Sequence, residues 1–120
     1  TADIDQLTPG AGEDGRADEN SASIDQSGDN NTADIRQRGD DNEAEVDQLS
    51  DNNTADILQT AGSNENTATI TQGLAGEEGD DQDDENAAAI RQEGDSNEAD
   101  ITQTGQSNDI GVGPGDDFGA

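Results

Sequence analysis

The chain of 120 residues contains no cysteine, so neither disulfide bonds nor thiolate metal ligands contribute to its fold. It also lacks histidine, lysine and tyrosine, and with them most of the usual catalytic bases and nucleophiles. No apolar run approaches the ~20 residues that a membrane-spanning helix needs. These absences predict a protein that is not an enzyme, has no catalytic or cofactor-binding residues and does not insert into a membrane.

Positively charged residues are scarce as well. Aspartate and glutamate number 31 against four arginines, which gives a formal net charge of −27. A charge of this sign repels phosphate backbones, so we expect no nucleic acid partner. An acidic surface without lysine indicates adaptation to high salt, in which calcium or other cations screen the repulsion between carboxylates.

Apolar residues are scarce: only 25% of the chain is hydrophobic, and one residue is aromatic. Such a composition is typical of a disordered acidic chain. The placement of the apolar residues opposes that interpretation, because nearly every isoleucine and most alanines recur on one fixed phase. A disordered tail has no reason to keep such a phase.

The phase belongs to a cassette, N-x-A-x-[IV]-x-Q, that recurs at a spacing of eleven residues over much of the chain. Full copies span residues 20–26, 31–37, 42–48, 53–59, 66–72, 86–92 and 97–103, a truncated copy spans 2–6, and a degenerate copy spans 108–112. The four repeated positions are occupied by Asn20, Ala22, Ile24, Gln26, Asn31, Ala33, Ile35, Gln37, Asn42, Ala44, Val46, Gln48, Asn53, Ala55, Ile57, Gln59, Asn66, Ala68, Ile70, Gln72, Asn86, Ala88, Ile90, Gln92, Asn97, Ala99, Ile101 and Gln103.

Within each copy, these four positions alternate with Thr, Ser, Asp, Glu and Arg. Alternation at period two predicts a β-strand with the repeated residues on one face. A short polar link follows each strand, and glycine permits the positive φ that a tight turn needs. The predicted turn glycines are Gly28, Gly39, Gly94 and Gly105. An amphipathic helix is the competing interpretation, and the asparagine, glycine and β-branched residues disfavour it.

One strand and one turn cannot fold alone, because ordering eleven residues costs ~10–20 kcal/mol and burying one isoleucine and one alanine returns only ~2–4 kcal/mol. Stacking supplies the deficit, since each strand then bonds a neighbour above and below. We therefore predict an all-β fold: a two-sheet parallel β-solenoid of eleven-residue units, about 22 residues per coil, that stacks end to end into cross-β fibres. Nine units make four and a half coils.

The repeats are expected to form one domain over residues 1–113, followed by a Gly/Asp-rich tail, 114–120. Two long acidic links, 7–19 and 73–85, are expected to project from corners of the solenoid without disturbing its register. The second contains Asp80, Asp81, Asp83, Asp84 and Glu85, whose hard oxygens suit calcium. Because the run lacks the spacing and glycine of an EF-hand loop, a diffusely solvated acidic loop is the alternative.

Stacking also places like charges side by side. Asp34 and Asp56 are expected one coil apart on an outer face, and Arg36 and Arg91 are expected at one shared outward position. At ~5 Å in water such a like-charge pair costs up to ~1 kcal/mol. Assembly should therefore strengthen with salt or divalent cations.

The run from Gln26 to Gln37, QSGDNNTADIRQ, resembles the curlin repeat Q-x-G-x-x-N-x-A-x-x-x-Q of the major curli subunit, and the run from Gln92 to Gln103 matches the same pattern. The pattern's glycine is absent after Gln48, where Ser50 stands, and displaced to Gly62 after Gln59. The resemblance covers most of the chain. It implies a secreted subunit of functional-amyloid fibres in a biofilm matrix, with inward Asn and Gln stabilising the stack.

The expected function is thus that of a structural subunit of extracellular, cell-surface fibres for biofilm matrix, adhesion and cell aggregation, with its export signal already removed. Its expected partners are copies of itself, a nucleator subunit and secretion or chaperone factors. The alternative is a monomeric acidic solenoid that binds calcium or a mineral or ice surface. Ice binding would use regular threonine rows, and only Thr67, Thr69 and Thr71 align within one strand.

Overall fold

A computed structural model describes residues 1–7, 19–60, 64–73, 85–105 and 107–113 of the chain. All of the regular structure in these residues is β-strand. The strands are β1 (Ala2–Leu7), β2 (Ser21–Gln26), β3 (Thr32–Arg38), β4 (Glu43–Gln48), β5 (Thr54–Gln59), β6 (Thr67–Gln72), β7 (Ala87–Gln92), β8 (Glu98–Gln103) and β9 (Asp109–Val112). Each strand coincides with one copy of the cassette.

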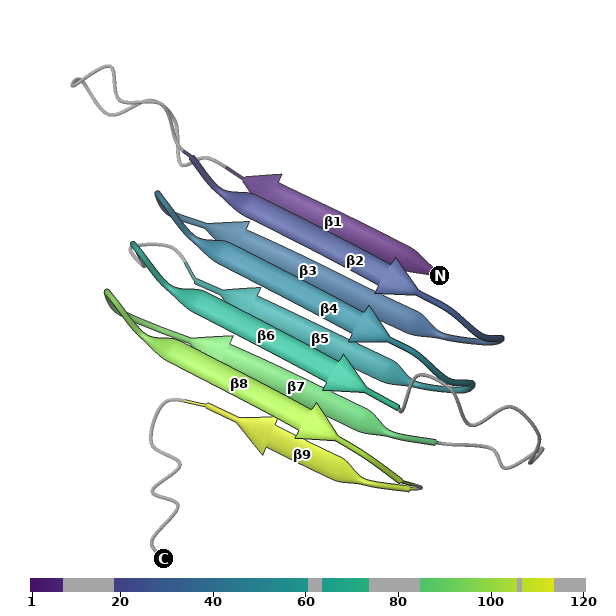
Figure 1. Ribbon diagram of the computed structural model, residues 1–120. Helices are drawn as coiled ribbons and strands as arrows, with labels where there is room; N and C mark the ends of the chain where they lie inside the picture. Colours follow the sequence, from purple (N-terminus) through teal and green to yellow (C-terminus); the bar gives the residue numbers. More distant parts are fainter. Residues whose placement is uncertain (8–18, 61–63, 74–84, 106, 114–120) are drawn as a thin grey trace, which may run out of the picture.

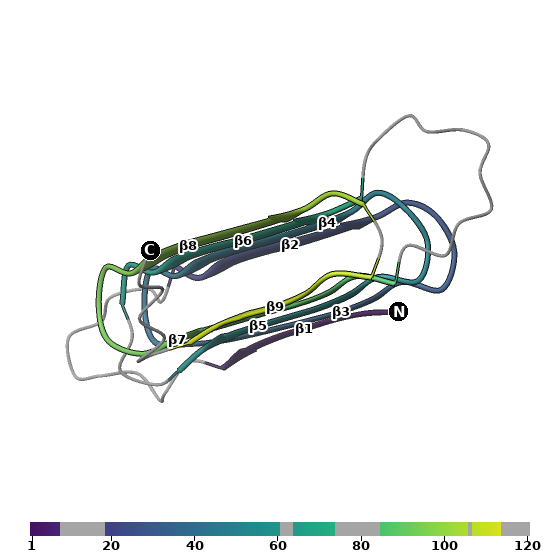
Figure 2. The same cartoon turned by 90° about the horizontal axis from the view of Figure 1, so that it is seen from below.

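Consecutive strands alternate between two facing sheets (Figure 1). The odd-numbered strands form a five-stranded sheet in the order β1-β3-β5-β7-β9, and the even-numbered strands form a four-stranded sheet in the order β2-β4-β6-β8. Every pairing is parallel. Figure 2 shows the two sheets as separate layers joined at their narrow edges. The predicted two-sheet parallel β-solenoid is confirmed.

The pairing register places identical cassette positions directly above one another. In the four-stranded sheet, Ala44 pairs with Ala68, Val46 with Ile70 and Gln48 with Gln72. The core is accordingly a thin apolar layer between the sheets. Its buried side chains are Ala33, Ile35, Ala44, Val46, Ala55, Ile57, Ala68, Ile70, Ala88, Ile90 and Ile101. The alternation of inward and outward residues is the one that the period of two dictates.

Most of the short corners turn with two residues of positive φ. The first of the two is the turn glycine. Its φ is positive in Gly28 (94°), Gly39 (117°), Gly94 (91°) and Gly105 (98°). The second such residue directly precedes the cassette asparagine, and it is never glycine. It is Asn30, Asp41, Asn52, Glu65, Ser96 or Ser107, with φ between 57° and 59°. This second left-handed position was not anticipated from the sequence.

Ser50 occupies the position at which the repeat otherwise carries a glycine. Two glycines from neighbouring coils make room for it: a Cβ on Gly73 would lie 2.3 Å from Ser50 Oγ, and one on Gly28 would lie 2.7 Å from Ser50 O. Gly73 has a φ of 88°, so this first residue of the long link is itself part of the turn. The absence of one glycine is therefore accommodated by the corners above and below.

The two long links leave the stack at opposite narrow edges. The connection after β1 joins Leu7 to Glu19, and the connection after β6 joins Gly73 to Glu85. Because odd strands end at one edge and even strands at the other, these connections start on different edges (Figure 1). Residues 8–18, 74–84 and the tail 114–120 lie outside the described residues.

Candidate functional site: amide ladders, outer rows and stack ends

Inward glutamines form ladders along the stack. In the four-stranded sheet, Gln26 Nε2 donates to Gln48 Oε1 (2.7 Å), Gln48 to Gln72 (3.0 Å) and Gln72 to Gln103 (2.8 Å). In the five-stranded sheet, Gln59 donates to Gln92 over 3.0 Å. Each donor points toward the C-terminal end of the stack, so the ladder has a direction.

The same amides also connect the two sheets. Gln72 Nε2 reaches the carbonyl oxygens of Thr54 (2.9 Å) and Asn86 (3.2 Å), both of which belong to the odd-numbered side. Gln59 Nε2 makes the reciprocal bonds to Glu43 O (3.0 Å) and Asn66 O (3.1 Å). The N–H groups of these buried amides therefore stabilise the margin of the core, where a polar group without partners is costly. Gln59 Oε1 is an exception, since it is buried and accepts no hydrogen bond.

Inward asparagines form a second ladder with the opposite direction. The backbone N–H of Asn66 donates to Asn42 Oδ1 (3.1 Å), and that of Asn97 donates to Asn66 Oδ1 (2.7 Å). On the other edge, the N–H of Asn53 donates to Asn31 Oδ1 over 2.9 Å. These donors point toward the N-terminal end. The two ends of the stack are thus chemically different, and complementary.

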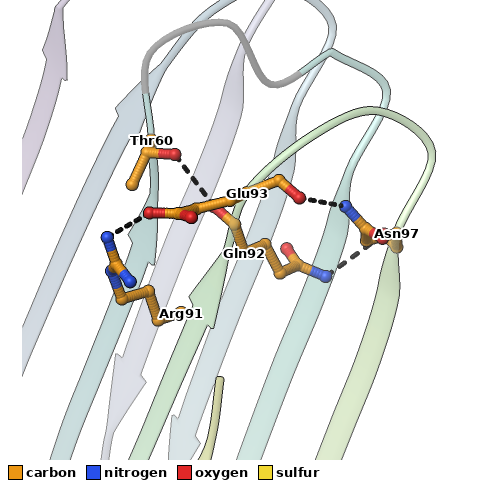
Figure 3. Close-up of polar contacts among 5 residues, drawn as sticks. All are labelled: Thr60, Arg91, Gln92, Glu93 and Asn97. Carbon is orange, nitrogen blue, oxygen red and sulfur yellow. Dashed lines mark hydrogen bonds and ion pairs between the residues drawn. The ribbon is translucent and has the colours of Figure 1, made fainter. Parts of the chain in front are cut away.

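Asparagine side chains also hold the corners. Asn97 Nδ2 donates to Glu93 O (3.1 Å), and Gln92 Nε2 donates to Asn97 O (3.2 Å) within the same corner (Figure 3). Thr60 Oγ1 donates to Gln92 O across to the next coil (3.3 Å). A local asparagine bond and a bond between coils therefore stabilise one turn together.

Outward carboxylates of the five-stranded sheet form a row. Asp3 pairs with Asp34, and Asp34 with Asp56, so Asp34 and Asp56 are one coil apart, as the repeat predicts. Arg36 forms an ion pair with Asp34 on its own strand. Burial, and then the neighbouring charge of Asp34, raise the pKa of Asp56 above its usual range, while Arg36 acts in the opposite direction.

Arg36 and Arg91 occupy the same outward position, with Leu58 between them. Arg91 forms an ion pair with Glu93, two residues along its own chain (Figure 3). Both arginines and their partners are partly exposed, so each pair relieves local repulsion and adds little to stability.

Among the described residues, outward threonines align along the axis only in short runs, such as Thr32 with Thr54 and Thr71 with Thr102. In the four-stranded sheet, Thr67 lies between Glu43 and Glu98, and Thr69 lies between Glu45 and Asp100. Charged residues flank Thr67 and Thr69 on both sides and Thr71 on one side, so the described part of this face lacks the long threonine rows that an ice-binding surface would show.

The acidic run proposed to bind calcium falls mostly outside the described residues. Asp80, Asp81, Asp83 and Asp84 lie there, and Glu85 is an exposed residue just before Asn86. Among residues 1–7, 19–60, 64–73, 85–105 and 107–113, no group of three or more acidic side chains is arranged to hold a metal ion. Calcium binding by the run therefore stays a prediction.

The ends of the stack expose the inward face of the terminal strands. Ile4 of β1 is 44% exposed and Ile110 of β9 is 38% exposed, and these are the large hydrophobic side chains that remain exposed in the described part of the chain. Both belong to the inward set, which is buried in the central strands. β1, β2, β8 and β9 are also the edge strands of their sheets.

A solenoid of this kind, with a thin aliphatic core bordered by buried amide ladders, defines a class of structural repeat protein. The model of the family described as "Curlin associated repeat" matches residues 17–49, 39–73 and 84–113. The chain belongs to this family, as the resemblance in its sequence predicts. The family is one of structural subunits that assemble into extracellular or cell-surface fibres, and not a family of enzymes.

No curated protein and no solved structure matched the chain. Within the part of the chain that the structure covers, no helix is long and apolar enough to cross a membrane.

Proposed function

We propose that this protein is a secreted subunit that assembles end to end into curli-like extracellular fibres, which serve biofilm matrix, adhesion and cell aggregation. The ends of the stack carry the proposal. Edge strands with unpaired backbone groups add further strands, and here they also expose Ile4 and Ile110 from the inward face. The opposite directions of the Gln and Asn ladders make one end complementary to the other, which favours an open, head-to-tail polymer.

The acidic outer rows support a fibre adapted to high salt. Each like-charge contact of the Asp3, Asp34 and Asp56 type costs up to ~1 kcal/mol at ~5 Å in water. The Debye length falls from ~8 Å at physiological ionic strength to ~3 Å at 1 M, which removes most of this repulsion. Calcium or other cations act here as screening ions. A nucleator subunit and secretion or chaperone factors complete the proposed pathway.

Electron microscopy and fibre diffraction of the purified chain at ~0.1 M and ~1 M NaCl test the proposal. We expect filaments with an axial reflection at ~4.8 Å, and more of them at the higher salt concentration. Calcium chloride at matched ionic strength separates specific calcium binding from screening. A folded monomer that forms no filaments under any of these conditions would contradict the proposal.

A variant pair links assembly to the ends. Ile4→Asp places a charge on the exposed inward face of β1, and Ser23→Asp adds the same charge on the outward face of β2. We expect Ile4→Asp to slow filament growth at least ~10-fold, since an unpaired charge cannot be buried at a junction. Ser23→Asp should grow nearly as the parent does. Equal growth of the two variants would mean that the inward face of β1 is not part of the contact.

A further inference from the structure

In the part of the chain that the structure describes, the two sheets contain unequal numbers of strands. Both β1 and β9 belong to the five-stranded sheet, so each end of the stack finishes on the same sheet. At the C-terminal end, the four-stranded sheet stops at β8, one strand short of its neighbour. Because strands alternate between the sheets, the strand that follows β9 in the stack would add to the four-stranded sheet, next to β8.

We propose that successive copies of this chain in the fibre are related by a half-turn about the fibre axis, with β1 of each copy pairing with β8 of the copy before it. This inference rests on the proposed end-to-end assembly and adds the arrangement of the copies. The five-stranded sheet of one copy continues the four-stranded sheet of the next. Each step advances the fibre by four and a half coils, about 22 Å.

Strand pairing favours this arrangement over one in which all copies share an orientation. The half-turn forms two junction ladders, β8 with the next β1 and β9 with the next β2. Copies in one orientation would pair β9 with the next β1 and leave a gap one strand wide between β8 and the next β2. Two strand edges would then keep unpaired N–H and C=O groups inside the fibre.

Side chains at the half-turn junction repeat the contacts of the interior. In register, Ala99, Ile101 and Gln103 of β8 meet Ala2, Ile4 and Gln6 of the next copy. Gln103 then donates to Gln6 as Gln72 donates to Gln103, and Gln6 continues the ladder by donating to Gln37 over 2.8 Å. The exposed Ile4 becomes an interior member of the isoleucine stack.

Charge opposes the half-turn at one place. In the half-turn arrangement, Asp100 lies beside Asp3 of the next copy. If all copies shared one orientation, Gly111 would lie beside Asp3 instead. That single exposed pair is screened by salt, and a missing ladder of backbone hydrogen bonds is not. Hydrogen bonding therefore decides the orientation.

Engineered disulfides distinguish the two arrangements, because the chain has no cysteine of its own. Adjacent outward positions on parallel strands lie within the 4.4–6.8 Å Cα separation that a disulfide requires (~4.8 Å). Asp3→Cys with Asp100→Cys should link copies in oxidised fibres that follow the half-turn. The matched pair, Asp3→Cys with Gly111→Cys, should link only copies in one orientation.

In denaturing gels of fibres grown at high salt and oxidised, we expect covalent multimers from the Asp3/Asp100 pair and monomers from the Asp3/Gly111 pair. The reverse pattern, or fibres that neither pair cross-links, overturns the half-turn. Cryo-electron microscopy of parent fibres should show alternating copies about 22 Å apart. If no fibres form from the parent chain, the proposed function fails as well, and this outcome is distinct from fibres with the other arrangement.

Discussion

Gln48 Nε2 donates to Oε1 of Gln72, 3.0 Å away on the next coil, and both side chains are fully buried. Gln72 in turn bonds Gln103 and the backbone carbonyls of Thr54 in β5 and of Asn86, which directly precedes β7. One side chain thus joins three coils and both sheets. A buried amide with this many bonds is costly to remove, because each former partner keeps its desolvation penalty.

Gln72→Ala should therefore lower the free energy of unfolding by ~3–5 kcal/mol, with several buried groups left unsatisfied. Gln26→Ala removes an equivalent side chain near the N-terminal end, where solvent can replace its bonds, and should cost only ~1 kcal/mol. Urea denaturation of both variants at high salt measures the difference. Equal losses would mean that position in the stack does not matter.

Glu65 holds a left-handed conformation with a φ of 58°. Asparagine tolerates this region better than glutamate does, so Glu65→Asn should stabilise the fold by ~0.5–1 kcal/mol. Glu65→Gln removes the same charge without the conformational benefit and serves as the control. Thermal denaturation of the three proteins tests the prediction, and it fails if Gln stabilises as much as Asn.

Gly73→Ala would place a Cβ 2.3 Å from Ser50 Oγ and 2.9 Å from Ser50 Cβ. Gly105→Ala meets nothing within 4 Å at a similar φ of 98°, so it measures the backbone strain alone. We expect Gly73→Ala to be the more destabilising by ~1–3 kcal/mol, since the corner is overpacked.

Ser50→Gly should recover more than half of that difference in a double-mutant cycle, because it removes both contacting side-chain atoms. Chemical denaturation of the single and double variants gives the coupling free energy. A coupling near zero would show that the strain of Gly73→Ala arises elsewhere.

The pKa of Asp56 is raised by burial and by Asp34, from a usual value of 3.8. A carboxyl with a raised folded-state pKa is harder to ionise in the fold, so its ionisation subtracts stability. The penalty is absent below the unfolded-state pKa and complete above the folded-state pKa. Asp56→Asn should thus stabilise the protein at neutral pH, and the gain should shrink as pH falls toward 3.8.

Because Asp56 is partly exposed, the gain at neutral pH should be only a fraction of ~1 kcal/mol. Asp100→Asn is the charge-matched control, since Asp100 pairs with Thr69 and not with a carboxylate. Unfolding free energies between pH 4 and pH 7, at constant ionic strength, test this. If both variants gain equally at every pH, the effect is one of net charge and not of the Asp34 contact.

The sequence was sufficient to predict the two sheets and the register because the cassette repeats almost without change. Ala33 and Ile35 can face inward only if Thr32 and Asp34 face out, and every later copy repeats that choice. The same repeat spacing also predicted that Asp34 and Asp56 lie side by side on paired strands. In such a stack, local periodicity already determines the long-range pairs.

What the sequence did not disclose depends on neighbours between coils. Glu65 shows no preference for positive φ, and only the corner geometry imposes it. The contact of Gly73 with Ser50 joins two atypical corners: one has Ser50 in place of the turn glycine, and the other begins a long link at Gly73. No single copy of the repeat shows this contact. A comparison of the residues preceding each cassette asparagine, mostly Asn, Asp and Ser, would have indicated the left-handed position.

If copies alternate by half-turns, the positions of the long links determine which links of neighbouring copies lie close together. Within one chain, the link after β1 and the link after β6 start on opposite edges. In the fibre, the β6 link of one copy and the β1 link of the next start on the same edge, two coils or about 10 Å apart. Residues 7–19 hold four acidic residues and residues 73–85 hold seven. The residues that anchor these two links, which together hold 11 acidic residues, would then lie on one edge close to each joint. We therefore expect the ions of the medium to affect elongation more strongly than the folding of a single subunit.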